Sequence, residues 1–180
     1  MKKWQLLKSD TVLSTPWFSL HKNNYKTTQG KIIHDYYVIE RNDFVLIIAM
    51  DNDQKIILIR QYRAATNQFY IALPAGYLQH GEQPEVAAKR ELFEETGYLA
   101  TNCRLIGELH PLPGYVSSRA YIVFCEASAK NSEIIDQIEI EEVLKVDLRQ
   151  AVQMIIRGEI NEMQAVSAIL LATNILESKN

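Results

Sequence analysis

Short apolar runs separated by polar turns dominate the first half of the chain and predict β-strands. Residues 44–50 and 55–59 are two such runs, and the four polar residues between them are typical of a hairpin turn. A second hairpin is predicted within residues 17–40, where a Thr-Thr-Gln-Gly turn separates two extended segments. The pattern therefore predicts an antiparallel N-terminal region followed by buried strands.

The second half of the chain alternates between strand and helix patterns. Further strands are expected at residues 103–109, 120–127 and 143–147, followed by helices at residues 148–157 and 162–176. Pro84 suits the start of a central helix and Gly97 its end, so this helix is predicted over residues 84–96, after a loop at residues 76–81. Mixed strands with segregated helices indicate an α/β or α+β sandwich.

Composition narrows the class of protein. The 180 residues, 47% of them hydrophobic, suit one domain or one core with a small appendage. A net charge of -3 argues against nucleic acid as the main partner, and no apolar run approaches the ~18 residues that span a membrane. Cys103 and Cys125 lie in apolar runs, where buried free thiols are expected, so a reducing, cytoplasmic compartment fits.

Candidate chemistry gathers on the central helix. At about 100° per residue, Glu91, Glu94 and Glu95 occupy roughly a 100° arc, with Arg90 beside Glu94. No lysine stands four residues after any of the three to relieve their repulsion, so another cation is expected. Clustered hard oxygen ligands suit Mg²⁺ or Mn²⁺, which bridge protein carboxylates to substrate phosphates.

The spacing of this segment, G-x5-E-x7-R-E-U-x-E-E-x-G-U, resembles the Nudix box. Its positions are filled here by Gly76, Glu82, Arg90, Glu91, Leu92, Glu94, Glu95, Gly97 and Tyr98. Only Tyr98 departs, since an aliphatic residue is usual there. A chance match to the fixed residues is on the order of one in 10⁸ per start position, so the resemblance is specific.

Segments outside the box are similar to the ADP-ribose pyrophosphatase branch of Nudix hydrolases. They are Arg-Gln-Tyr-Arg at residues 60–63, Leu-Pro-Ala-Gly at residues 73–76, Pro113 sixteen residues after Gly97, and the acidic residues 139–142. The resemblance covers roughly residues 15–175. It implies a Nudix-type α/β/α sandwich with a mixed sheet over residues 42–180, and an antiparallel strand extension over residues 1–41 that builds a homodimer.

The resemblance also implies a metal site. Glu91 and Glu95 become the main ligands, Glu82 and Glu94 complete the cluster directly or through water, and the Ala75 carbonyl adds an oxygen. Arg90 is then expected to orient the carboxylates, a role that suits its planar fork. The alternative for Arg90 is an ordinary surface pair with Glu94 four residues later.

Substrate and base residues are implied outside the helix. Arg63 resembles the residue that meets the diphosphate or terminal sugar, with a surface arginine as the alternative, and Pro113 with Gly114 marks a substrate loop. Glu139 matches the general base best, with Glu141 as its rival. The implied reaction is Mg²⁺-dependent hydrolysis of ADP-ribose to AMP and ribose 5-phosphate.

Two departures from the branch bear on the substrate. Ala72 stands where an acid usually precedes Leu-Pro-Ala-Gly, and the loop at residues 115–119 lacks the acidic residues that are often found there. A GDP- or UDP-linked sugar therefore stays as an alternative. A Nudix-fold sensor that binds a nucleotide without hydrolysing it is the rival class, and the intact glutamates of the box argue against it.

Overall fold

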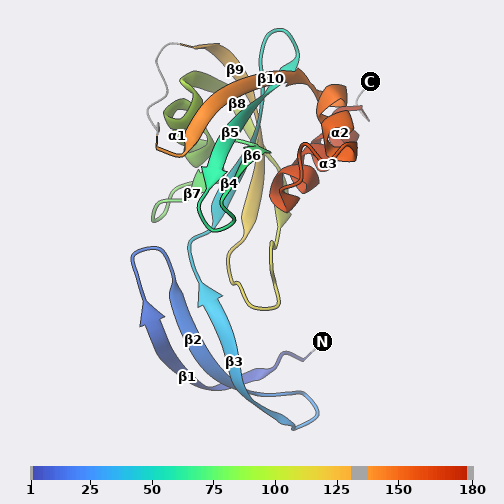
Figure 1. Cartoon of the computed structure of the whole chain (residues 1–180). Coiled ribbons are helices and arrows are strands. Elements are labelled where there is room, and N and C mark those ends of the chain that lie inside the picture. The colour runs from blue at the N-terminus through green and yellow to red at the C-terminus, as the bar shows by residue number, and fades with distance from the viewer. Residues whose placement is uncertain (1, 131–137, 178–180) are drawn as a thin grey trace. The chain divides into compact units, whose positions relative to one another are not determined.

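The computed structural model describes residues 2–130 and 138–177 (Figure 1). The chain divides into two compact units. The smaller unit comprises residues 1–43 and 110–119, and the larger comprises residues 44–109 and 120–180. The segment at residues 110–119 thus belongs with the N-terminal strands although it follows the central helix in sequence.

The smaller unit contains a three-stranded antiparallel sheet in the order β1 (Gln5–Ser14), β2 (Ser19–Lys26), β3 (Ile32–Glu40). The predicted hairpin of β2 and β3 is confirmed, and Gly30 closes its turn with φ +85°, donating its N–H to the Thr27 carbonyl at 3.0 Å. The hydrophobic pattern does not predict β1, although β1 lies within the strand extension over residues 1–41 that the resemblance implies. All ten residues of β1 are exposed, so no alternation of buried and exposed positions marks it as a strand.

The larger unit is built on a seven-stranded mixed sheet with the path β10-β5-β4-β9-β8, to which β6 and β7 add beside β5 and β4. The parallel pairing is that of β4 with β9. The strands are β4 (Phe44–Met50), β5 (Lys55–Arg63), β6 (Gln68–Ala72), β7 (Ala75–Tyr77), β8 (Tyr98–Leu109), β9 (Ala120–Lys130) and β10 (Ile140–Asp147). The β4–β5 hairpin is confirmed, but the two strands pair at Met50 and Ile56 and then separate to other partners.

Helices cover both faces of this sheet, which confirms the α/β/α sandwich (Figure 1). Alternate residues of β4 point to opposite faces, so Val45 and Ile47 pack beneath α1 with Leu92. Leu46 and Ile48 pack on the other face, in the cluster that α2 and α3 cover. Because both faces are buried, β4 has the continuous apolar sequence of a central strand.

The helices lie where the sequence predicts them, as α1 (Pro84–Thr96), α2 (Leu148–Ile156) and α3 (Met163–Glu177). Gly97 caps α1 in the left-handed region with φ 74°, and its N–H donates to the Phe93 carbonyl. Within residues 2–130 and 138–177, no helix is long and apolar enough to cross a membrane. The prediction of a loop at residues 76–81 is wrong at its start, because β7 includes Gly76 and Tyr77.

The prediction of free thiols is wrong. Cys103 of β8 and Cys125 of β9 form a disulfide, with their Cα atoms 4.2 Å apart. The two residues are 22 positions apart in sequence, and only the antiparallel pairing of β8 with β9 brings them together. The expectation of a reducing compartment loses the support that it drew from free thiols.

Candidate metal and diphosphate site

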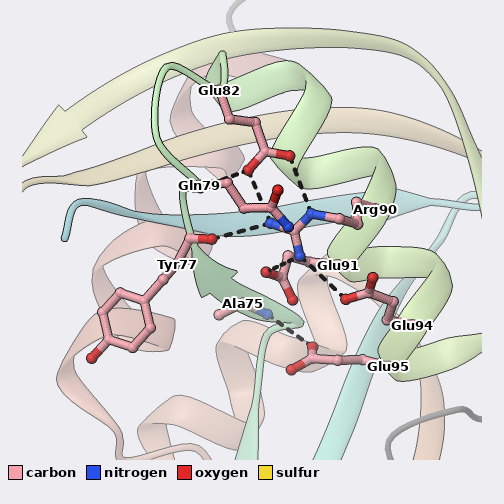
Figure 2. A network of polar contacts seen from close by, with 8 residues as sticks. All are labelled: Ala75, Tyr77, Gln79, Glu82, Arg90, Glu91, Glu94 and Glu95. Carbon is pink, nitrogen blue, oxygen red and sulfur yellow. Dashed lines mark hydrogen bonds and ion pairs between the residues drawn. The ribbon is translucent and has the colours of Figure 1, made fainter. Parts of the chain in front are cut away.

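The predicted metal-site residues converge where β7 and the following loop meet α1 (Figure 2). β7 adds to the start of β4, with Gly76 opposite Val45, and this pairing fixes the backbone that faces the helix. A short loop then connects β7 to α1. Glutamates from the loop and from the helix surround a single guanidinium, that of Arg90.

Arg90 holds this cluster together through its planar fork. Nε donates to Glu82 Oε1 at 3.1 Å and Nη2 to Glu82 Oε2 at 3.0 Å, a bidentate pair. Nη1 donates to Glu91 Oε1 at 2.6 Å and to Glu94 Oε2 at 3.2 Å, and Nη2 also reaches the Tyr77 carbonyl at 3.1 Å. The surface-pair alternative is therefore too simple, because Glu94 is one of three carboxylate partners.

Charge pairing around Arg90 sets its protonation and that of Glu82. The hydrogen bonds that Arg90 donates to Glu82 raise the pKa of Arg90 above its ordinary value. In turn, the hydrogen bond from Arg90 lowers the pKa of Glu82, against the effect of burial, with help from the Gln79 backbone N–H at 2.9 Å. Glu82 thus stays ionised and fastens the loop to the helix.

Glu91 occupies space that only a glycine at position 76 leaves open. A Cβ atom at Gly76 would lie 2.0 Å from the Glu91 carboxyl carbon, far inside van der Waals contact. Burial raises the pKa of Glu91, and the nearby Arg90 partly offsets that effect. This carboxylate is therefore desolvated, and a nearby cation would stabilise its ionised form.

Glu95 and Glu94 complete the cluster differently. Glu95 Oε2 accepts a hydrogen bond from the Ala75 N–H at 3.0 Å, so the helix end is joined to β7. Glu94 is the most open of the carboxylates that Arg90 contacts, with 42% of its side chain exposed. The predicted use of the Ala75 carbonyl as a ligand stays a prediction, since the contact seen is through its amide.

The chemistry of this donor set suits a hard divalent cation. Glu82, Glu91, Glu94 and Glu95 offer only oxygen donors, and Gly76 leaves room for the Glu91 carboxylate. Within the part of the chain that the structure describes, no three His, Cys, Asp or Glu side chains form a ready cation cage. The carboxylates instead point to Arg90 and to the Ala75 amide, which hold them close together in the protein alone.

Arg63 and Glu139 meet at the same end of the sheet. β5 runs antiparallel to β4, so its last residue, Arg63, lies at the end where β4 begins and β7 pairs with it. Arg63 Nη1 donates to Glu139 Oε2 at 2.8 Å. The predicted substrate residue and the predicted base are thus direct partners, which the sequence did not indicate.

The backbone around Glu139 explains this contact. The Tyr62 N–H donates to the Glu139 carbonyl at 2.9 Å, and Ile140 pairs with Gln61. The register then shifts between Ile140 and Glu142, so the rival base, Glu141, is the extra residue of a β-bulge. Arg63 contacts the carboxylate that lies before the bulge.

Sequence analysis missed Glu162, a half-buried carboxylate immediately before α3. Burial raises the pKa of Glu162, and the charge of Arg63 works in the opposite direction. Arg63 therefore acts on two carboxylates from different elements, one preceding β10 and one preceding α3. No motif contains Glu162, and a single acid at the start of a helix looks like an ordinary cap.

Pro113 and Gly114 belong to the smaller unit, where they line a cavity of about 260 Å³. The Tyr36 hydroxyl donates to the Gly114 carbonyl. The rings of Trp4, Tyr25 and Tyr36 form a cluster with centroids 5.6 to 6.5 Å apart, and all three residues line the cavity with Tyr115. Contact of Pro113 and Gly114 with substrate stays a prediction.

Comparison with known proteins places this geometry in a family. A model of the NUDIX domain matches residues 40–164. The GDP-mannose pyrophosphatase of Escherichia coli O1:K1 / APEC is 34% identical over 173 residues, which cover 89% of this chain and 90% of that protein. The GDP-mannose pyrophosphatase of Klebsiella pneumoniae subsp. pneumoniae is 32% identical over 185 residues, covering 95% and 93%.

A second kind of relative matches a shorter stretch. The ADP-ribose pyrophosphatase of Bacillus subtilis (strain 168) is 29% identical over 134 residues, covering 73% of this chain and 72% of that protein. A crystal structure described as an ADP compounds hydrolase has a TM-score of 0.85, covering 100% of this chain and 97% of that one. At 24% sequence identity, this structure supports the fold.

Proposed function

The chain belongs to the Nudix family, and from this premise we propose the reaction of its site. It is a Nudix pyrophosphatase that hydrolyses the diphosphate bond of a nucleoside diphosphate sugar. The first substrate that we propose is ADP-ribose, with AMP and ribose 5-phosphate as products. The observation that carries the proposal is the cluster of glutamates around Arg90, in which Gly76 leaves room for Glu91.

The cofactor that we propose is Mg²⁺, with Mn²⁺ as a substitute. Glu91 and Glu95 would hold it, with Glu82, Glu94 and the Ala75 carbonyl completing the oxygen ligands directly or through water. When bound, such an ion neutralises diphosphate oxygens and lowers the pKa of bound water. Arg90 then keeps the carboxylates oriented, because its five N–H donors hold several of them at fixed angles.

The remaining roles fall to Arg63 and Glu139. Arg63 binds a phosphate of the substrate through its planar N–H donors. Glu139 accepts a proton from water, the water oxygen forms a bond to one phosphorus, and the bond from that phosphorus to the bridging oxygen breaks. The bridging oxygen leaves with the other phosphate, so two monophosphates are formed.

GDP-mannose is the second substrate candidate. The relatives named for it align over 89% and 95% of this chain, whereas the relative named for ADP-ribose aligns over 73%. Function depends on the residues of the site and not on the fold, so the longer match to these relatives supports GDP-mannose as a candidate. Ala72, in place of the usual acid, points the same way.

A substrate panel tests the proposal. Purified protein with Mg²⁺ is given ADP-ribose, GDP-mannose and a UDP-sugar, and release of phosphate monoesters is measured. Turnover of at least one substrate is expected, with Glu95→Gln losing roughly 10²-fold or more in kcat. Glu85→Gln, in the first turn of the same helix, is the matched control and should keep the wild-type rate. Nucleotide binding without turnover would favour a sensor.

We also propose a homodimer formed through the N-terminal strands, in a cytoplasmic protein that binds neither nucleic acid nor membrane. Support for the dimer comes from β1, an edge strand of its sheet with all ten residues exposed.

A further inference from the structure

The contact between Arg63 and Glu139 competes with the proposed role of each residue, because it engages one oxygen of the base and one nitrogen of the phosphate-binding arginine. A general base needs a carboxylate oxygen available to accept a proton from water. Glu139 Oε2 instead accepts a charge-assisted hydrogen bond from Arg63 Nη1 at 2.8 Å. A phosphate-binding arginine likewise needs its N–H donors available for the substrate.

We propose that Arg63 and Glu139 form a latch that the substrate opens. In the free protein Arg63 holds Glu139, and the diphosphate of the substrate takes over the guanidinium, so that the Glu139 carboxylate becomes available to accept the water proton. The inference rests on the proposed hydrolysis of a nucleoside diphosphate sugar. It adds that the base becomes available only when the substrate is bound.

The energy of the ion pair suits such an exchange. The side chains of Arg63 and Glu139 are 40% and 53% exposed, so the pair is partly solvated and weak. A diphosphate carries more charge than one carboxylate and matches the guanidinium fork in bidentate fashion. Substrate is therefore expected to win the competition, at the cost of a small part of its affinity.

The backbone keeps Glu139 in place when its side chain is released. Its carbonyl accepts the Tyr62 N–H at 2.9 Å, and Ile140 pairs with Gln61 on β5. Release of the carboxylate then needs only side-chain rotation. The charge of Glu162 also acts on Arg63, so the guanidinium retains a nearby negative charge after it leaves Glu139.

A neighbouring ion pair, between β5 and β10, provides a control. Arg60 Nε lies 3.2 Å from Glu142 Oε2, and these side chains are 42% and 50% exposed, close to the values for the latch. The control pair also joins an arginine to a glutamate at similar exposure, but neither residue has a role in the proposed site. Loss of charge at Glu142 therefore measures the general electrostatic effect of removing one carboxylate.

The test measures binding of an α,β-methylene analogue of the sugar nucleotide that the wild-type protein hydrolyses, by calorimetry with Mg²⁺. Glu139→Gln removes the competitor for Arg63, so the analogue should bind about two- to fivefold more tightly, the range that an exposed ion pair supports. In the Arg63→Gln background, Glu139→Gln should change the affinity little. Glu142→Gln should leave it at the wild-type value.

Two results would overturn the latch. Unchanged or weaker binding by Glu139→Gln, in a protein that hydrolyses its substrate, would show that Glu139 does not compete for Arg63. Equal tightening in the presence and absence of Arg63 would show simple charge repulsion. Failure of the proposed function is separate and would appear first, as a wild-type protein that turns over no nucleotide sugar.

Discussion

At the scale of single residues, the site depends on space as much as on charge. The sequence shows a glycine at position 76, and the structure supplies the reason, since the Glu91 carboxylate fills the volume that a side chain would need. Gly76 does not have a left-handed backbone, so the requirement is steric and not conformational. A glycine before the helix is therefore part of the proposed metal site.

Gly76→Ala should displace the Glu91 carboxylate and weaken Mg²⁺ binding by roughly 10- to 100-fold, the range seen when groups that support a ligand are lost. The fold should persist, because the clash is with the end of a side chain. Calorimetry with Mg²⁺ measures the affinity. The control is Gly81→Ala. Gly81 has a φ of 75°, so an alanine there costs about 1 kcal/mol of stability, but its Cβ atom would contact no other group. Metal affinity equal to that of the wild type in Gly76→Ala would contradict the steric argument.

Glu162→Gln should raise the melting temperature near pH 7.5. Burial raises the pKa of Glu162 in the folded state, with Arg63 opposing, so the folded state binds this proton more tightly than the unfolded state does. The contribution of Glu162 to the free energy of unfolding is therefore fully present below its pKa in the unfolded state, about 4.3. This contribution is lost as the pH rises through the pKa of the folded state. Removing the ionisable group should add about 2 °C at pH 7.5, which corresponds to less than ~1 kcal/mol.

At pH 4, Glu162→Gln should raise the melting temperature less or not at all, since Glu162 is then largely neutral in both the folded and the unfolded state. Glu159→Gln is the control on the preceding loop. The hydrogen bond from Arg157 lowers the pKa of Glu159, so this variant should gain no stability at pH 7.5. Thermal unfolding followed by circular dichroism distinguishes the two variants, and a lower melting temperature for Glu162→Gln would contradict the sign of the effect.

At the scale of elements, sequence patterns identified the helices and strands that are marked by their own cap residues or by regular burial along their length. Pro84 and Gly97 enclose α1, and the apolar run of β4 follows from burial on both faces. By contrast, β1 is exposed along its whole length, so it has no hydrophobic period to detect. A sequence pattern identifies a strand or helix only where buried positions recur regularly along that element.

Contacts between distant elements could not be predicted in the same way. Arg63 and Glu139 are 76 positions apart, and their contact depends on the register of β5 with β10 and on the bulge at Glu141. The disulfide depends equally on the pairing of β8 with β9. The residues of the box were identifiable because they lie within one segment, whereas the network around Arg90 required the fold of the loop.

Arg90→Lys should loosen the attachment of the loop at residues 78–83 to α1. Lysine keeps the positive charge but lacks the fork that binds both oxygens of Glu82 while reaching Glu91 and the Tyr77 carbonyl. A fall of roughly 10- to 100-fold in kcat is expected, with faster amide hydrogen exchange in the loop. Lys89→Ala, on an exposed position of the same helix, should leave both unchanged. Wild-type exchange in Arg90→Lys would show that charge alone holds the loop.

At the scale of the whole molecule, the disulfide adds a constraint that sequence analysis did not foresee. It joins positions 22 residues apart, for which chain-entropy arguments give about 3 kcal/mol of stability. Reduction should therefore lower the melting temperature by roughly 6–12 °C. The variant with Cys103→Ala and Cys125→Ala should melt at a lower temperature and be insensitive to reductant. Two reactive thiols in the unfolded, unreduced protein would contradict the bond.

Assembly is the last property that the fold predicts. β1 is an edge strand whose exposed residues include Leu6, Leu7, Val12 and Leu13, and an open edge with apolar side chains favours pairing with a second chain. Light scattering should give twice the chain mass of 20.7 kDa. Leu13→Asp should shift the protein toward monomer, because a charge buried in such an interface is costly. Ser9→Asp, at an exposed polar position of the same strand, should preserve the dimer. A wild-type monomer at micromolar concentration would contradict the assembly, and it would leave the apolar residues of β1 uncovered in solution.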